Sequence, residues 1–366
     1  MGAFEKRPDI KEIRQTTGAA IGAMGSSVIP CRLELDRFGG RRVEKIELHV
    51  NITTTGTITT AAGKDGLEGI FREVRVRVSD AAGSERFAIK ANSTSLLNRC
   101  RFLNGDLDRH TKAAWGMQAT AGTYDLVIPV YFRNPLLSEF VGPKFALPLD
   151  PAFVTGNPVV EIDVGTLNDV GIASTTGAFT INYIRSSIEY VDGVPSDGSV
   201  PYIPTQFVSY DIWNSGAPSG EQEWSLPEDG QLAAIQVEEF SAASTRGYAL
   251  SQSGLFGLWQ FAYNGTVRRQ GYSKLLEAMN DRWMKTVRQG DSGTVDAANP
   301  VATWEWDFFN DSDQGSAGSP GSTYSLYIAA SGQRGKLRTT NLAANGWARV
   351  STYKLMSQNL AALVGA

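Results

Sequence analysis

Cysteine and histidine are both scarce in this chain of 366 residues, which contains two of each. Two cysteines are too few for a scaffold held together by disulfides. Cys31 lies in an alternating run typical of a strand and Cys100 in a run typical of a helix, so both are expected to be buried free thiols. His49 and His110 have no second histidine or cysteine at zinc-ligand spacing, and no nucleophile turn accompanies them. These absences argue against a zinc enzyme or a triad hydrolase, and we expect a protein that is not an enzyme.

Long apolar runs and an excess of positive charge are absent as well. No uninterrupted apolar stretch reaches the roughly 20 residues needed to span a bilayer, and the first residues lack the apolar core of a secretion signal. Folding in a reducing cytoplasm is therefore expected. Thirty-four basic and 38 acidic residues give a net charge of −4, which argues against a protein that coats nucleic acid or recognises a nucleic-acid sequence, although a local basic patch stays open.

What the chain does contain is a repeated alternation of apolar and polar residues, together with 38 glycines and 15 prolines that suit tight turns. Between Ile46 and Thr53 every second residue is apolar, which is typical of a half-buried antiparallel strand. The strands expected in the first half are residues 29–35, 46–53, 73–78, 85–90, 124–132, 145–149, 159–164 and 178–190. Those expected in the second half are residues 207–213, 232–240, 255–263, 304–308, 324–329 and 347–356. The eight strands of the first half are the number that a jelly roll requires.

A helix is expected at the same place in each half. Residues 92–95 offer N-caps to a helix near Ser93–Phe102, and Asn104 with Gly105 stops it. In the second half, apolar residues at spacings of three and four predict a helix over Ser273–Arg288. One strand plan with one helix thus occurs twice, which predicts an all-β fold of two tandem eight-stranded jelly-roll sandwiches.

Composition divides the chain into three parts. Residues 1–27 have mixed charge, including Lys6, Arg7, Lys11 and Arg14, and too few apolar residues to fold alone. They are expected to be an arm that orders only against a partner or its own domain, or else a frayed terminus. Residues 192–204 are rich in glycine, proline and serine and mark a boundary. The expected domains are residues 28–195 and 196–366.

Four acidic residues of the second half are candidate site residues. Glu238 and Glu239 are adjacent on a strand and point to opposite faces, so they cannot converge. Glu305 and Asp307 share a face and offer a glycosidase pair, but a solvated polar face behind a tryptophan-rich core is the favoured interpretation. No cofactor is expected.

A loose calcium site is the one metal site to consider. Asp311 and Asp313 begin a run that is similar to the start of a calcium loop, but residue 322 is a serine where the later glutamate of an EF-hand belongs. They stay weak candidates for a structural calcium ion.

The order of strands around each helix resembles the double jelly-roll major capsid proteins of tailless icosahedral viruses and phages. The resemblance covers about residues 28–356. It is most evident where residues 103–110 follow the first helix and lead to the long strand at residues 123–132. It is an architectural resemblance, because that family has no catalytic or binding motif to compare.

The resemblance implies a coat protein that forms homotrimers of six-sided outline and tiles an icosahedral virion shell beside penton or spike proteins. It further implies that the arm, with Lys6, Arg7, Lys11 and Arg14, faces the interior, where neighbours or an internal membrane lie. The loop at residues 310–323 is then expected in an outer tower or a contact between subunits. The alternatives are a carbohydrate-active or carbohydrate-binding double jelly-roll protein that uses exposed tryptophans with Glu305 and Asp307, and a spike, penton or minor capsid component.

Overall fold

The computed structural model is almost entirely β-structure in its described part. The described residues are 11–15, 21–35, 42–56, 58–60, 69–79, 85–104, 121–132, 147–148, 159–167, 169–170, 172–175, 177–191, 205–213, 220–227, 231–240, 256–273, 275–276, 302–307, 327–328, 335–341 and 347–355. No helix within these ranges is long and apolar enough to cross a membrane.

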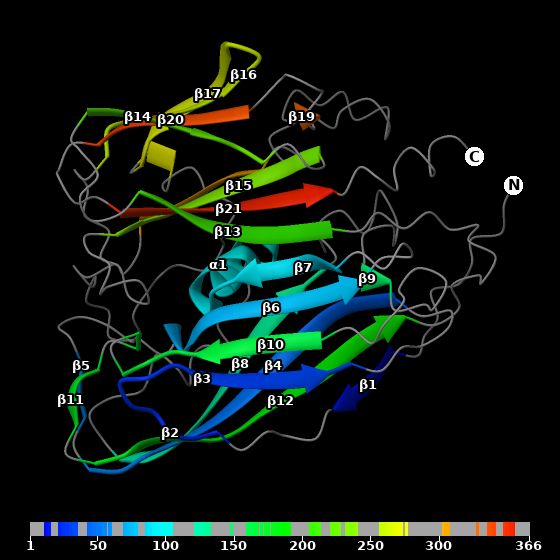
Figure 1. Ribbon diagram of the computed structural model, residues 1–366, viewed down its shortest axis with the longest axis vertical. Helices are drawn as coiled ribbons and strands as arrows, with labels where there is room; N and C mark the ends of the chain where they lie inside the picture. Colours follow the sequence, from blue (N-terminus) through cyan, green and yellow to red (C-terminus); the bar gives the residue numbers. More distant parts are fainter. Residues whose placement is uncertain are drawn as a thin grey trace, which may run out of the picture.

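Three sheets build the body of the molecule (Figure 1). The first has the path β1 (Lys11–Gln15), β12 (Phe179–Val191), β4 (Arg42–Thr54) and β8 (Gly122–Tyr131), with β2 (Gly22–Ala23) on β12 and β9 (Leu147–Pro148) on β4. We call it the lower sheet. The second, the upper sheet, has the order β14 (Gly220–Ser225), β20 (Gly335–Asn341), β16 (Leu258–Tyr263) and β17 (Thr266–Tyr272).

The third sheet is shared by both halves of the chain. Its order is β18 (Ala302–Asp307), β15 (Gln231–Phe240), β21 (Trp347–Leu355), β13 (Thr205–Trp213), β7 (Glu85–Ala91), β6 (Phe71–Ser79), β10 (Val159–Val164) and β3 (Ile29–Glu34), with β19 (Tyr327–Ile328) on β15. The halves meet where β13 pairs with β7 in parallel, through Phe207 opposite Ile89 and Val208 opposite Lys90. A small ribbon of β5 (Ile58–Thr60) and β11 (Ile172–Thr175) stands apart.

Each half is a sandwich of two four-stranded layers, as the alternation of apolar residues predicts. In lobe 1, the lower sheet packs on β7, β6, β10 and β3 around a buried cluster that includes Ile46, Ile128 and Val160. In lobe 2, the upper sheet packs on β18, β15, β21 and β13 around Trp259 and Trp304. Two tandem jelly-roll sandwiches are therefore confirmed, and so is the first helix, α1 (Ser93–Asn104).

Part of the segment expected as an arm belongs to the lower sheet. Residues 11–15 pair with β12, Lys11 opposite Val191 and Arg14 opposite Ile188, and residues 22–23 pair with the same strand. An otherwise unpaired edge of β12 satisfies the hydrogen bonds of this short segment, so it orders against its own domain. Lys6 and Arg7 lie outside the described residues.

Three strands of lobe 2 were not predicted. Residues 220–225 form β14, residues 266–272 form β17, and residues 335–341 form β20. For β17 the missed signal is Asn264-Gly265, a dipeptide typical of two-residue hairpins. Both of its residues have positive φ, 55° and 75°. Of the second expected helix, only residues 273, 275 and 276 are described, and they are helical.

Candidate functional site

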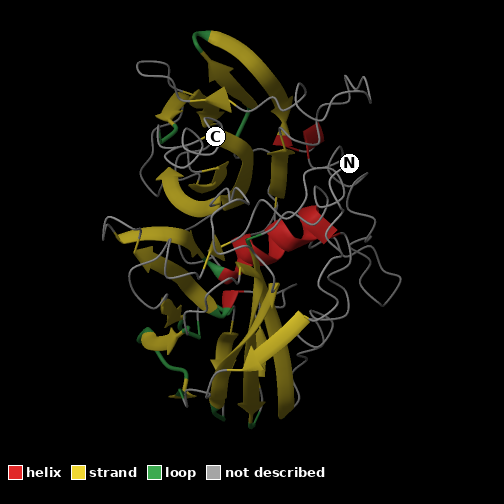
Figure 2. Cartoon of the chain, turned by 90° about the vertical axis from the view of Figure 1, so that its right-hand side faces the viewer, coloured by secondary structure: helices red, strands yellow, loops and turns green. Residues whose placement is uncertain are grey.

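The helix α1 belongs to lobe 1 but lies at the waist between the two lobes (Figure 2). Asn92 caps it by accepting a 2.7 Å hydrogen bond from the Ser95 backbone N–H. The Cys100 thiol donates to the Pro129 carbonyl of the edge strand β8 at 3.3 Å. The helix therefore covers this edge of the lower sheet, while its Ser95 and Arg99 contact lobe 2.

Lobe 2 presents a buried polar layer to α1. Along β15, Ile235 and Val237 point into the tryptophan core, while Gln236 and Glu238 point to the opposite face. The Gln236 amide donates to the Ser95 carbonyl of α1 at 3.3 Å and to the Glu238 carboxylate at 3.1 Å. This face of the sheet is polar and yet shielded from water.

An ion pair crosses the waist directly. Arg99 of α1 contacts Glu305 of β18 through Nη1 and Oε1, and the two side chains are 5% and 1% exposed. The Arg99 guanidinium also lies 4.4 Å from the ring centroid of Tyr353 on β21. Removing either partner of such a buried pair leaves the other charge uncompensated in a dry site. The pair therefore holds lobe 2 in one position on the helix of lobe 1.

A second cation supports the same layer. Arg349 of β21 donates through Nε to Asp211 of β13 at 3.0 Å, and its Nη1 lies 3.6 Å from Glu238. Ser209 and Ser351 share a 2.6 Å hydrogen bond in the neighbouring row. The layer is thus a cross-strand network on β18, β15, β21 and β13, and its geometry provides mechanical linkage between the lobes.

Glu239 occupies the opposite face of β15, as predicted for adjacent strand residues. It is 1% exposed and accepts hydrogen bonds from Trp259 Nε1 at 2.8 Å and Trp304 Nε1 at 3.3 Å. The Ser273 hydroxyl at the start of the helical turn after β17 also donates to it. One carboxylate therefore joins three parts of the lobe 2 core.

The interpretation of Glu305 as part of a solvated face is wrong, because α1 covers that face. The prediction that the tryptophans pack in the core is confirmed for Trp259, Trp304 and Trp306, which are 0%, 0% and 4% exposed. These rings are not available for stacking on a sugar. The side chain of Asp307, like Asp311 and Asp313, lies outside the part that the structure describes.

His49 has a serine and a carboxylate beside it, but not in the arrangement of a triad. Ser187 Oγ lies 2.9 Å and Glu47 Oε2 lies 3.7 Å from the same imidazole nitrogen, Nε2. A triad needs the carboxylate on one ring nitrogen and the nucleophile on the other. In the described ranges no three His, Cys, Asp or Glu side chains are grouped so that they could hold a metal ion. His110 lies outside those ranges.

Both cysteines are buried free thiols, as predicted. Burial raises the pKa of the Cys31 thiol, which reduces the thiolate fraction at neutral pH. We therefore expect a thiol reagent such as Ellman's reagent to modify neither cysteine in the native protein at pH 7 and two per chain after unfolding in guanidinium chloride. Rapid modification of the native protein would contradict the burial of Cys31 and Cys100.

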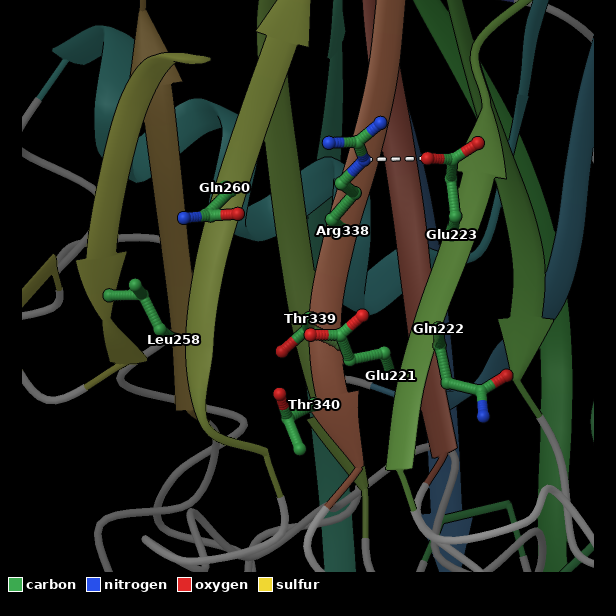
Figure 3. Close-up of a pocket in the computed structure, with 8 residues that line it drawn as sticks. All are labelled: Glu221, Gln222, Glu223, Leu258, Gln260, Arg338, Thr339 and Thr340. Carbon is green, nitrogen blue, oxygen red and sulfur yellow. Dashed lines mark hydrogen bonds and ion pairs between the residues drawn. The ribbon is translucent and has the colours of Figure 1, made fainter.

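The outer face of the upper sheet carries a polar hollow of about 570 Å³. Glu221, Glu223, Gln260 and Arg338 are among its lining residues (Figure 3). Glu223 accepts hydrogen bonds of 2.5 Å from both Lys336 and Arg338. These donors hold the pKa of the exposed Glu223 carboxyl below its usual value. The hollow is therefore of mixed charge, with Glu221 and Glu223 on β14 and Arg338 on β20.

Comparison with solved structures identifies the architecture. The structure of Sulfolobus turreted icosahedral virus matches at a TM-score of 0.60 and 13% identity, over 97% of this chain and 96% of that one. The PBCV-1 virus capsid matches at 0.58 and 11% over 97% of both chains. The major capsid protein P2 of bacteriophage PM2 matches at 0.50 and 13% over 94% and 98%.

The chain has the double jelly-roll fold of viral major capsid proteins. The resemblance inferred from the order of strands and helix is thereby confirmed as a resemblance of fold. No model of a protein family and no curated protein matches the sequence. The double jelly-roll fold is therefore recognised here through coordinates, at identities of 11–13%.

Proposed function

We propose that this chain is a major coat protein whose role is structural. The observation that carries the proposal is the extent of the fold match, which includes both sandwiches and spans nearly the whole of this chain and of the capsid proteins it matches. A similarity confined to one sandwich would carry less weight, because single jelly rolls serve many functions.

The linkage between the lobes supports this role. A shell subunit must hold its two lobes in a fixed relative orientation so that both can contact neighbouring subunits. The continuous sheet through β13 and β7 and the Arg99–Glu305 pair fix that orientation. We infer that the chain forms homotrimers of six-sided outline that tile an icosahedral virion shell, beside penton or spike proteins, after synthesis in the host cytoplasm.

The N-terminal segment is proposed to face the interior of the shell. Lys6 and Arg7 precede β1 and are proposed to meet neighbouring chains or the anionic headgroups of an internal membrane, at about 1 kcal/mol for each basic residue near such a surface. Lys11 and Arg14 belong to β1 at the edge of lobe 1. No catalytic role, cofactor or nucleic-acid sequence is part of the proposal, and structural calcium at Asp311 and Asp313 stays a weak proposal.

Assembly of the purified chain tests the proposal. We expect size-exclusion chromatography with light scattering to give a mass of three chains, and negative-stain images to show six-sided particles or closed shells. Binding of the same sample to vesicles of anionic and of neutral lipid tests the role of the N-terminal segment. A chain lacking residues 2–10 should lose any preference for the anionic vesicles. A protein that stays monomeric at all concentrations would contradict the coat-protein role.

A further inference from the structure

Exposed apolar side chains are concentrated at one edge of lobe 2. Among the described residues, the large apolar side chains that are exposed are Val267 at 39%, Tyr272 at 61% and Leu275 at 55%. All three lie on β17 or in the helical turn that follows it, beside the exposed Arg268. We call these four residues the β17 patch. Tyrosine, arginine and grouped apolar side chains are the composition of protein–protein interfaces.

The β17 patch stands on a rigid base. A Cβ at Gly271 would lie 2.5 Å from Leu276 Cδ2, so the glycine lets Leu276 pack directly onto the strand. The Ser273 hydroxyl is held by the buried Glu239. Tyr272 and Leu275 therefore project from a fixed turn, which lowers the entropy lost when a partner binds them.

The position of the patch favours contact with another molecule. β17 is an edge strand of the upper sheet, and the β16–β17 hairpin lies at the end of the long axis farthest from lobe 1 (Figure 1). The register with β16 shifts opposite Arg268, because Phe261 pairs with Arg269 and Ala262 with Val267. Such a bulge disfavours continuous strand pairing with another edge. A partner is therefore expected to contact side chains rather than extend the sheet.

The complementary surface lies at the other edge of the same sheet. β14 carries the exposed Glu221 and Glu223 beside the polar hollow (Figure 3). Two β17 patches facing each other would carry an arginine each and no carboxylate, so such a contact offers Arg268 no opposite charge. A contact between the β17 patch and β14 sets Arg268 against Glu221, because the charge of Glu223 is already matched by Lys336 and Arg338.

We propose that the β17 patch of one copy docks on the β14 edge and its hollow on the next copy of this chain, with Arg268 opposite Glu221. The contact is head-to-tail, so it closes into a ring or continues through a lattice. Its place in a shell rests on the coat-protein function proposed above, whereas the contact itself does not.

A charge-exchange experiment tests the pairing. We expect Arg268→Glu and Glu221→Arg each to weaken association of the full chain at least tenfold in sedimentation-equilibrium measurements. The double variant, in which the two charges are exchanged, should recover most of the loss. The matched control is Arg72→Glu, the same charge change at an exposed arginine of β6 in lobe 1, which should associate like the wild type.

The apolar part is tested by Tyr272→Ser, which should also weaken association at least tenfold while near-UV circular dichroism and the melting temperature stay unchanged. The assignment is overturned if Arg268→Glu associates normally, if the double variant does not recover, or if the Arg72→Glu control is equally weak. If all of these variants still form shells as the wild type does, the contact is rejected and the coat-protein function is kept. If the wild type forms small oligomers that depend on Arg268 but never forms shells, the contact is kept and the coat-protein function is rejected. A strictly monomeric wild type rejects both.

Discussion

Replacing Arg99 with methionine is expected to lower the free energy of unfolding by about 3–5 kcal/mol, the range found when one partner of a buried ion pair is removed. Glu305, whose side chain is 1% exposed, would be left without its cation in a site that α1 still shields from water. The stacking of the guanidinium on Tyr353 would be lost as well. Urea unfolding followed by the fluorescence of the buried tryptophans measures the change.

Two further variants test whether the loss of stability comes from breaking the buried pair or from removing a charge at any position. Arg32→Met removes the cation of a pair with Glu34 that is 57% and 65% exposed, and exposed pairs contribute at most about 1 kcal/mol. The double variant Arg99→Met with Glu305→Leu removes both buried charges, and such apolar replacements are often neutral. A double variant as unstable as Arg99→Met alone would contradict the role of the uncompensated carboxylate.

Replacing Glu239 with leucine is expected to lower the free energy of unfolding by about 3 kcal/mol or more, because each buried donor left without an acceptor costs about 1–3 kcal/mol. Three donors depend on this carboxylate, namely the indole N–H groups of Trp259 and Trp304 and the Ser273 hydroxyl. Denaturant unfolding measures the loss, and a shift in tryptophan emission should accompany it.

Glu239→Gln is the matched control, since it keeps an acceptor oxygen in a side chain of the same shape. We expect it to lose less than half of the stability that the leucine variant loses. The leucine variant should also weaken self-association, because Ser273 anchors the turn that carries Leu275 and follows Tyr272. Equal stabilities of the leucine variant and the wild type would show that Glu239 does not organise this core.

The long strands of lobe 1 could be predicted because one face of each strand is buried and the other is accessible to solvent. Ile46, Leu48 and Val50 are buried and alternate with half-buried polar residues, so a period of two was visible in the sequence. The strand β17 could not be found this way, because its residues 266–268 are exposed in succession. An edge strand with little burial shows no alternation, and only its Asn-Gly turn marks it.

The candidate site was harder to predict than the fold. Glu305 was expected to be solvated because it alternates with Trp304 and Trp306. Alternation in one strand shows that its two faces differ in polarity, but it does not show which element covers the polar face. The covering element is α1, whose Arg99 lies 206 positions away in the sequence. A contact of that separation leaves no local pattern.

By itself the sequence determined the strand alternation, the first helix, the buried thiols and the doubled plan, because these follow from local periodicity and from which side chains avoid water. Only the tertiary structure decided that the two sandwiches share one sheet, that an arginine–glutamate pair links them, and that the exposed apolar side chains gather beside Arg268 on β17. The first two features depend on residues far apart in the chain, and the third depends on which side chains the fold leaves uncovered. In each case the free energy of burial or exposure is set by the neighbours that the fold supplies.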